Sequence, residues 1–256
     1  MGTFLTAIGC FHPVRTSQLL YLSFFSMPLT IYLISTISNL TGNLVALIIG
    51  LLYCYRRSSP PYLRIFPVYL FVSLAVEVIA GAFIGKVFHF SIFGDHQPYA
   101  KKVIYNLYTL FELYVFAWFL FQVLRSSLIR RLLIALVILF SIYFIFYLLQ
   151  TDIGKKNNMS LIVLESLIII IPCLTFYREL FTGKEPIDLL KTPSFWLVTG
   201  IFFYLATIIP LCAATDYMFS HGLTKAVRNL ASINSFALVV TYLLFIKGFT
   251  CRIKKS

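Results

Sequence analysis

Seven predominantly apolar runs follow one another along the chain. They cover approximately residues 29–53, 65–88, 103–124, 131–150, 159–181, 195–217 and 229–248. A helix of about 20 residues spans the hydrocarbon core of a bilayer. The chain is 60% hydrophobic and only 12% charged, with a mean hydropathy of +0.90, whereas soluble domains carry about 25% charged residues. The sequence therefore predicts an all-α integral membrane protein, a bundle of seven transmembrane helices.

The runs define one seven-helix membrane domain over residues 29–250, with a short segment on either side. Residues 18–28 read QLLYLSFFSMP, which is apolar but too short to cross a bilayer and is closed by a proline. We therefore expect residues 1–28 to form a lead-in, interfacial segment. Residues 251–256 are expected to form a short basic cytoplasmic tail.

Basic residues are distributed unequally between the two sides of the predicted bundle. The loops after the odd-numbered runs and the C-terminal tail hold thirteen Lys and Arg residues, against eight on the other side. Because cations are retained on the cytoplasmic side, we expect the N-terminus outside and the C-terminus inside, in a cytoplasmic (inner) membrane. The net charge of +12 comes from these short clusters between apolar runs. The lipid bilayer is thus the expected partner, and nucleic acid is not.

Polar side chains interrupt several of the apolar runs. Three of them are the carboxyl groups of Glu77, Glu112 and Glu165. An ionised side chain at the bilayer centre costs about 2.5–3.5 kcal/mol on insertion scales, so these groups should be protonated, hydrogen-bonded or in contact with water. Asn39 and Asn43 are four residues apart and therefore lie on one face of their helix.

In the predicted orientation most of these polar residues fall in the outer half of the bundle. The inner halves of the first, fifth and seventh runs are almost wholly apolar. We therefore predict an outward-facing polar pocket above a dry inner plug. The predicted ligand-binding residues are Glu77, Glu112, Glu165, Asn39, Asn43, Tyr108 and Asn234. The alternative is that each carboxyl group only joins two helices through a buried hydrogen bond.

Several kinds of chemistry lack their usual residues. No lysine lies midway along the last run, as a retinal protein requires, and no GxSxG turn or phosphate-binding glycine loop is present. The cysteines form no CxxC pair. The histidines lie in predicted outer loops or rims without HxxxH spacing, at His12, His89, His96 and His221. We therefore predict no catalytic residue, no metal and no cofactor, while a site built from His89, His221 and a glutamate stays open.

Two stretches resemble a known kind of protein. They are NLYTLFE at residues 106–112 and PSFWLVTGIFFY at residues 193–204. Together they resemble a group of uncharacterised bacterial seven-span proteins, which are similar in layout to the seven-span sensor modules of some histidine kinases. The resemblance implies sensing or signalling. No transmitter domain follows the seventh run in this sequence, so output through a partner protein is expected.

Three functions remain open on the sequence. The first is a receptor-like sensory protein that signals to a cytoplasmic partner through the loop at residues 178–193. The second is a transporter of a small solute or ion, with the glutamates as coupling groups. The third is an intramembrane enzyme that modifies lipids. A polar path that continued through the inner half of the bundle would favour transport over sensing.

Overall fold

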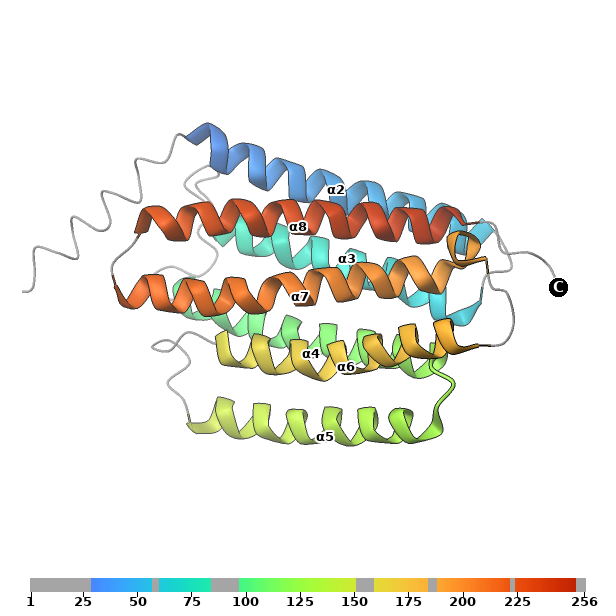
Figure 1. Cartoon of the computed structure of the whole chain (residues 1–256). Helices are drawn as coiled ribbons and strands as arrows, with labels where there is room; N and C mark the ends of the chain where they lie inside the picture. Colours follow the sequence, from blue (N-terminus) through green and yellow to red (C-terminus); the bar gives the residue numbers. More distant parts are fainter. Residues whose placement is uncertain are drawn as a thin grey trace, which may run out of the picture.

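The chain folds into long helices that lie side by side (Figure 1). The structure, a computed structural model, describes residues 29–56, 60–83, 97–150, 159–183, 188–221 and 224–251. Within these ranges every regular element is helical. The predicted lead-in segment 1–28 lies outside the described residues, as do residues 252–256 of the predicted tail.

Seven helices in the described part are long and apolar enough to cross a membrane, as the sequence predicts. This architecture indicates a multi-pass membrane protein. A single turn of 3-10 helix, η2 (Leu189–Lys191), precedes the sixth of them. The long helices are α2 (Leu29–Arg56), α3 (Pro61–Phe83), α4 (Gln97–Val123), α5 (Ser127–Gln150), α6 (Met159–Thr182), α7 (Pro193–Ser220) and α8 (Thr224–Thr250).

Several helices extend beyond the apolar runs that predict them. Helix α4 begins six residues before the predicted start at residue 103, and α8 begins five residues before the predicted start at residue 229. Hydropathy marks only the part of a helix that lipid contacts, whereas backbone hydrogen bonding continues into polar ends. For the same reason the loop predicted at residues 178–193 is shorter than expected, because α6 continues to Thr182 and α7 begins at Pro193.

The seven helices form a ring that closes on itself. Each helix packs against its neighbour in sequence, and α8 also packs against α2. Helix α4 additionally contacts α6 and α7, so one of its faces points into the ring, while Leu107, Tyr114 and Trp118 on its other side are exposed. Helix α5 packs mainly against α4 and α6, and Figure 1 shows it at the edge of the bundle. The apolar face that α5 leaves uncovered fits a lipid-facing helix, as its sequence predicts.

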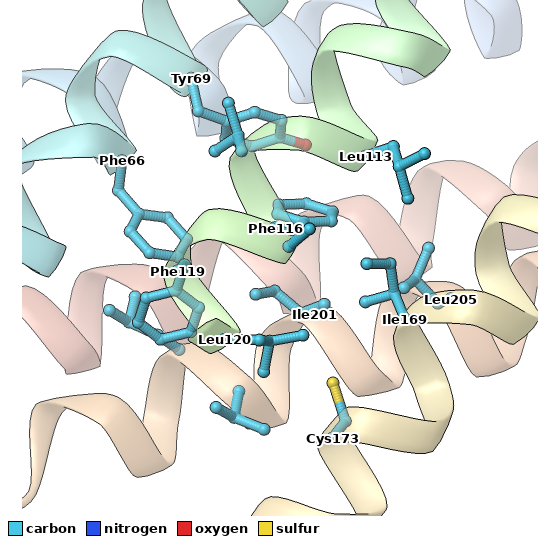
Figure 2. Packing of buried hydrophobic residues seen from close by; sticks show 14 of the residues in the cluster. Phe66, Tyr69, Leu113, Phe116, Phe119, Leu120, Ile169, Cys173, Ile201 and Leu205 are labelled. Atoms are coloured by element: carbon cyan, nitrogen blue, oxygen red, sulfur yellow. The ribbon is translucent and has the colours of Figure 1, made fainter. Parts of the chain in front are cut away.

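Aromatic rings fill the half of the bundle that contains the start of α3 and the end of α4. Phe66 and Phe119 are fully buried, with ring centroids 4.8 Å apart in an edge-to-face arrangement. Phe245 of α8 packs on the other side of Phe66, at 5.3 Å. Figure 2 shows Phe66, Phe116 and Phe119 reaching into one continuous apolar cluster with side chains from α6 and α7. We call Phe66, Phe119 and Phe245 the aromatic plug.

A carboxylate fixes the short turn between α4 and α5. The Glu179 side chain on α6 accepts hydrogen bonds from the backbone N–H groups of Arg125 and Ser126, at 2.8 and 2.9 Å. These N–H groups immediately precede α5 and have no helical partner of their own. A negative charge at a helix N-terminus is also favourable because of the helix dipole. Glu179 therefore ties the peripheral α5 to α6 at this end.

Replacing Glu179 with alanine is expected to lower the free energy of unfolding by about 1–2 kcal/mol, because two hydrogen bonds to a charged acceptor are lost at a partly solvated turn. Glu179→Gln keeps one acceptor oxygen and should lose less. Reversible unfolding in mixed micelles measures both variants. The matched control is Asp188→Asn, which breaks the exposed ion pair with Lys191 and should change stability little. Equal stability of Glu179→Ala and this control would contradict the assignment.

Candidate functional site

The inward face of α4 places Glu112 in the middle of the bundle. Glu112 is the tenth of the 21 residues of the apolar span Val103–Val123, and Tyr69 is the ninth of 19 in Pro61–Ile79. The Glu112 side chain is only 6% exposed. Its Oε1 atom accepts a 2.7 Å hydrogen bond from the Tyr69 hydroxyl. In Figure 2 the Tyr69 ring extends from α3 with its oxygen towards α4.

A second carboxyl group, from α6, faces Glu112. Glu165 is 3% exposed and interacts electrostatically with Glu112. Its Oε1 atom is buried and accepts no hydrogen bond from the residues that the structure describes. Two buried acidic groups from different helices thus lie within electrostatic range of each other, one with a hydroxyl donor and one with an unpartnered oxygen.

Four tyrosines from four helices interact with Glu112, and one of them also interacts with Glu165. Tyr69 and Tyr108 stack with ring centroids 6.4 Å apart. Tyr204 on α7 interacts electrostatically with both Glu112 and Glu165, and Tyr242 on α8 interacts with Glu112. We call Glu112, Glu165 and these four tyrosines the central cluster.

A chain of amides and hydroxyls continues from the central cluster towards α2. Asn43 is 1% exposed and donates a 3.2 Å hydrogen bond to the Ser73 Oγ atom. Both side chains interact electrostatically with the Tyr242 hydroxyl of α8. The half-buried Glu77, one turn beyond Ser73 on α3, also interacts with Tyr242. The polar contacts therefore reach from α6 through the bundle to α2.

Two predicted ligand-binding residues lie apart from this chain of contacts. Asn39 donates a 3.4 Å hydrogen bond to Ser235, which joins α2 to α8 about one turn from Asn43. Asn234 is half-buried on α8, and no hydrogen bond in the described part of the chain connects it to the central cluster. The structure thus brings five of the seven predicted residues together: Asn43, Glu77, Tyr108, Glu112 and Glu165.

The tyrosines of α3 and α8 are the functional candidates that sequence reasoning missed. Tyr69 precedes Ser73 and Glu77 by four and eight residues, so the same helical spacing extends the polar face to it. Tyr242 lies in the inner half of the last run, which is almost wholly apolar. The central cluster therefore lies near the middle of the spans, deeper than the outer half in which the polar residues were predicted. Glu165 is an exception, because it is the seventh of the 24 residues in its span and lies nearer one end.

The turn η2 directly precedes α7. Side chains at the beginning of α7 and at the end of α8 hold this turn in place. The Leu190 carbonyl oxygen accepts hydrogen bonds from Trp196 Nε1 at 3.1 Å and from Cys251 Sγ at 3.3 Å. The Lys247 ammonium lies 5.9 Å from the centre of the Trp196 ring, a cation–π contact. Helix α7 therefore carries both Tyr204 and Trp196, while α8 carries Tyr242 and Lys247 and is followed directly by Cys251.

Metal-dependent chemistry has no support in the described ranges. In those ranges no group of three or more His, Cys, Asp or Glu side chains is arranged to hold a metal ion. The exposed His221 ring lies near the end of α7, with Nδ1 2.9 Å from the Tyr217 carbonyl oxygen. His12, His89 and His96 lie outside the described residues, so the histidine–glutamate site stays an untested prediction.

Comparison with known proteins gives no relative from which a role of the central cluster could be inferred. The resemblance to seven-span sensor modules remains a prediction. No protein-family model, no curated protein and no solved structure matches this chain.

Proposed function

We propose that this chain is a receptor-like sensory protein of a cytoplasmic membrane, which detects a small ligand or ion in the central cluster and signals through a partner protein. The observation that carries the proposal is the burial of Glu112 and Glu165, from two helices, beside the tyrosines of the central cluster. Ionisable groups at this depth are costly and usually functional. A role limited to joining helices would not require an unpartnered Glu165 oxygen.

The aromatic plug favours sensing over transport. Phe66, Phe119 and Phe245 are each at most 1% exposed and fill the bundle beside the cluster. With the N-terminus outside, as the distribution of basic residues predicts, the plug lies on the cytoplasmic side. A ligand in the central cluster is then closed off from the cytoplasm.

Helices α7 and α8 provide a physical route from the cluster to the cytoplasmic end. Each carries one cluster tyrosine, and the Leu190 carbonyl oxygen is held by Trp196 on α7 and by Cys251 directly after α8. A shift of either helix relative to α4 would therefore move η2. Exposed Phe181 and Leu190, together with the Asp188–Lys191 ion pair, make this end suitable for contact with a partner.

Hydrogen–deuterium exchange tests the relay without knowledge of the ligand. Glu112→Gln removes the ionisable group while keeping the side-chain shape, and we expect the exchange rate across residues 188–192 to change about fivefold or more, the lower range of allosteric coupling. The control is Tyr114→Phe, which alters an exposed hydroxyl on the same helix that hydrogen-bonds Ser141. Exchange changes confined to the surroundings of Glu112 would contradict the relay.

A transporter is the second candidate, because two intramembrane carboxyl groups without a basic partner also suit proton coupling. Reconstitution into proteoliposomes separates the two functions. Solute uptake driven by a pH gradient and abolished by Glu112→Gln would establish transport. Absence of such uptake, with the relay intact, would leave sensing.

A further inference from the structure

Among the side chains that the structure describes, none with a positive charge lies near the acidic pair in the central cluster. The titratable groups that face it are Tyr69 and Glu77 from α3, Tyr108 from α4 itself, Tyr204 from α7 and Tyr242 from α8. Described side chains of α5 contribute no ionisable group to either carboxyl group. The basic side chains that the structure describes lie in the first or last turns of helices or in the connecting turns, far along the chain from the middle of the spans.

Two ionised carboxylates in this position would be strongly destabilising. A buried, uncompensated charge costs several kcal/mol, and the mutual repulsion of two like charges adds to that cost. Glu112 has partial compensation, since the Tyr69 hydroxyl donates to its Oε1 atom at 2.7 Å. Glu165 is 97% buried, and its Oε1 atom accepts no hydrogen bond from any described residue. The unmet requirement is a positive charge or a hydrogen-bond donor at Glu165.

We propose that Glu165 and Glu112 form a proton-binding site, which retains one exchangeable proton at neutral pH. Binding of the proton removes one of the two buried charges and leaves a single negative charge on the pair, which the Tyr69 hydroxyl stabilises through its hydrogen bond to Glu112. The proton belongs to the pair, because two interacting carboxyl groups titrate together. Release of the proton restores the repulsion between α4 and α6, and uptake of it removes that repulsion.

The sensory role of the proton rests on the proposed function, because it makes the proton the condition that the protein senses. Proton binding itself is a property of the isolated protein, so it can be tested separately from the relay. A bound proton without a response at residues 188–192 would leave the site intact and overturn the sensory proposal. A response at residues 188–192 without a bound proton would overturn the proton-binding site and leave the sensory proposal intact.

Infrared difference spectroscopy of the purified full-length protein in nanodiscs tests the site. At neutral pH we expect a carbonyl-stretching band of a protonated carboxyl group, which shifts in D2O and disappears in alkaline buffer. Glu165→Gln should abolish this band, and Glu179→Gln, which alters a carboxylate outside the cluster, should retain it. A wild-type spectrum without the band, or a band that persists in Glu165→Gln, would overturn the proposal.

Two further arms keep the result decisive. If Glu165→Gln does not fold, Glu112→Gln should retain the band but shift its frequency and move its disappearance to a different pH, because the neighbouring charge is gone. An unchanged band in that variant would refute sharing of the proton. Replacing choline chloride with sodium chloride at constant pH should leave the band intact. Loss of the band with a rise in melting temperature would identify an alkali-metal site and overturn the assignment of a proton.

Discussion

Phe66→Ala is expected to lower the free energy of unfolding by about 2–3 kcal/mol. The Phe66 ring is fully buried and packs edge-to-face against Phe119, Phe245 and Phe249, at 4.8, 5.3 and 6.3 Å. Truncating a buried Phe in a water-soluble core costs about 3–5 kcal/mol. The expected loss is smaller here, because unfolded helices remain in lipid and only the packing and cavity contributions are lost.

Reversible unfolding by SDS in mixed micelles measures the effect of Phe66→Ala. Phe71→Ala provides the matched control, because Phe71 lies on the same helix and is 62% exposed. The control should stay within about 0.5 kcal/mol of the wild type. If the two variants lose equal stability, Phe66 does not occupy the centre of a packed plug.

Gly200→Ala is expected to cost about 2–3 kcal/mol, towards the upper end of the usual range for overpacking a well-filled core. A Cβ atom at residue 200 would lie 2.7 Å from Cε1 and 2.9 Å from Cδ1 of Phe245. The Phe245 ring cannot move aside easily, because it is 1% exposed and packs against Phe66. Gly200 therefore permits the close approach of α7 and α8, as small residues do between membrane helices.

The same unfolding assay tests this close approach. Gly183→Ala is the matched control, because its Cβ atom would meet only ordinary contacts, at 3.4 Å or more, just after α6. Combining Gly200→Ala with Phe245→Leu should recover part of the lost stability, since the smaller side chain makes room. Neutral behaviour of Gly200→Ala alone would show that α7 and α8 do not meet closely at this point.

The seven long helices of the described ranges, and the polar faces on them, could be predicted from the sequence. Long apolar runs require helices in lipid, because backbone polar groups find no other partners there. The four-residue spacing of Asn39 and Asn43 likewise predicted one polar face on α2. Asn43 indeed bonds across to α3, through Ser73.

The assembly of the central cluster could not be predicted in the same way. Periodicity shows which face of a helix is polar, but it does not show which helices are neighbours, so the contacts of α4 with α6 and α7 were not foreseeable. Tyrosine is equally common in apolar packing and in hydrogen bonding. Tyr69 and Tyr242 therefore became candidates only when their neighbours were known.

A double-mutant cycle on Glu112 and Glu165 tests most directly whether the two carboxyl groups share one buried site. The free energy of unfolding is measured for Glu112→Gln, for Glu165→Gln and for the double variant. Because either substitution removes the same electrostatic interaction between the two carboxyl groups, we expect a coupling energy of about 0.5–3 kcal/mol, as found for residues that interact directly or within one network. Additivity within about 0.3–0.5 kcal/mol, as for distant and independent sites, would contradict the account.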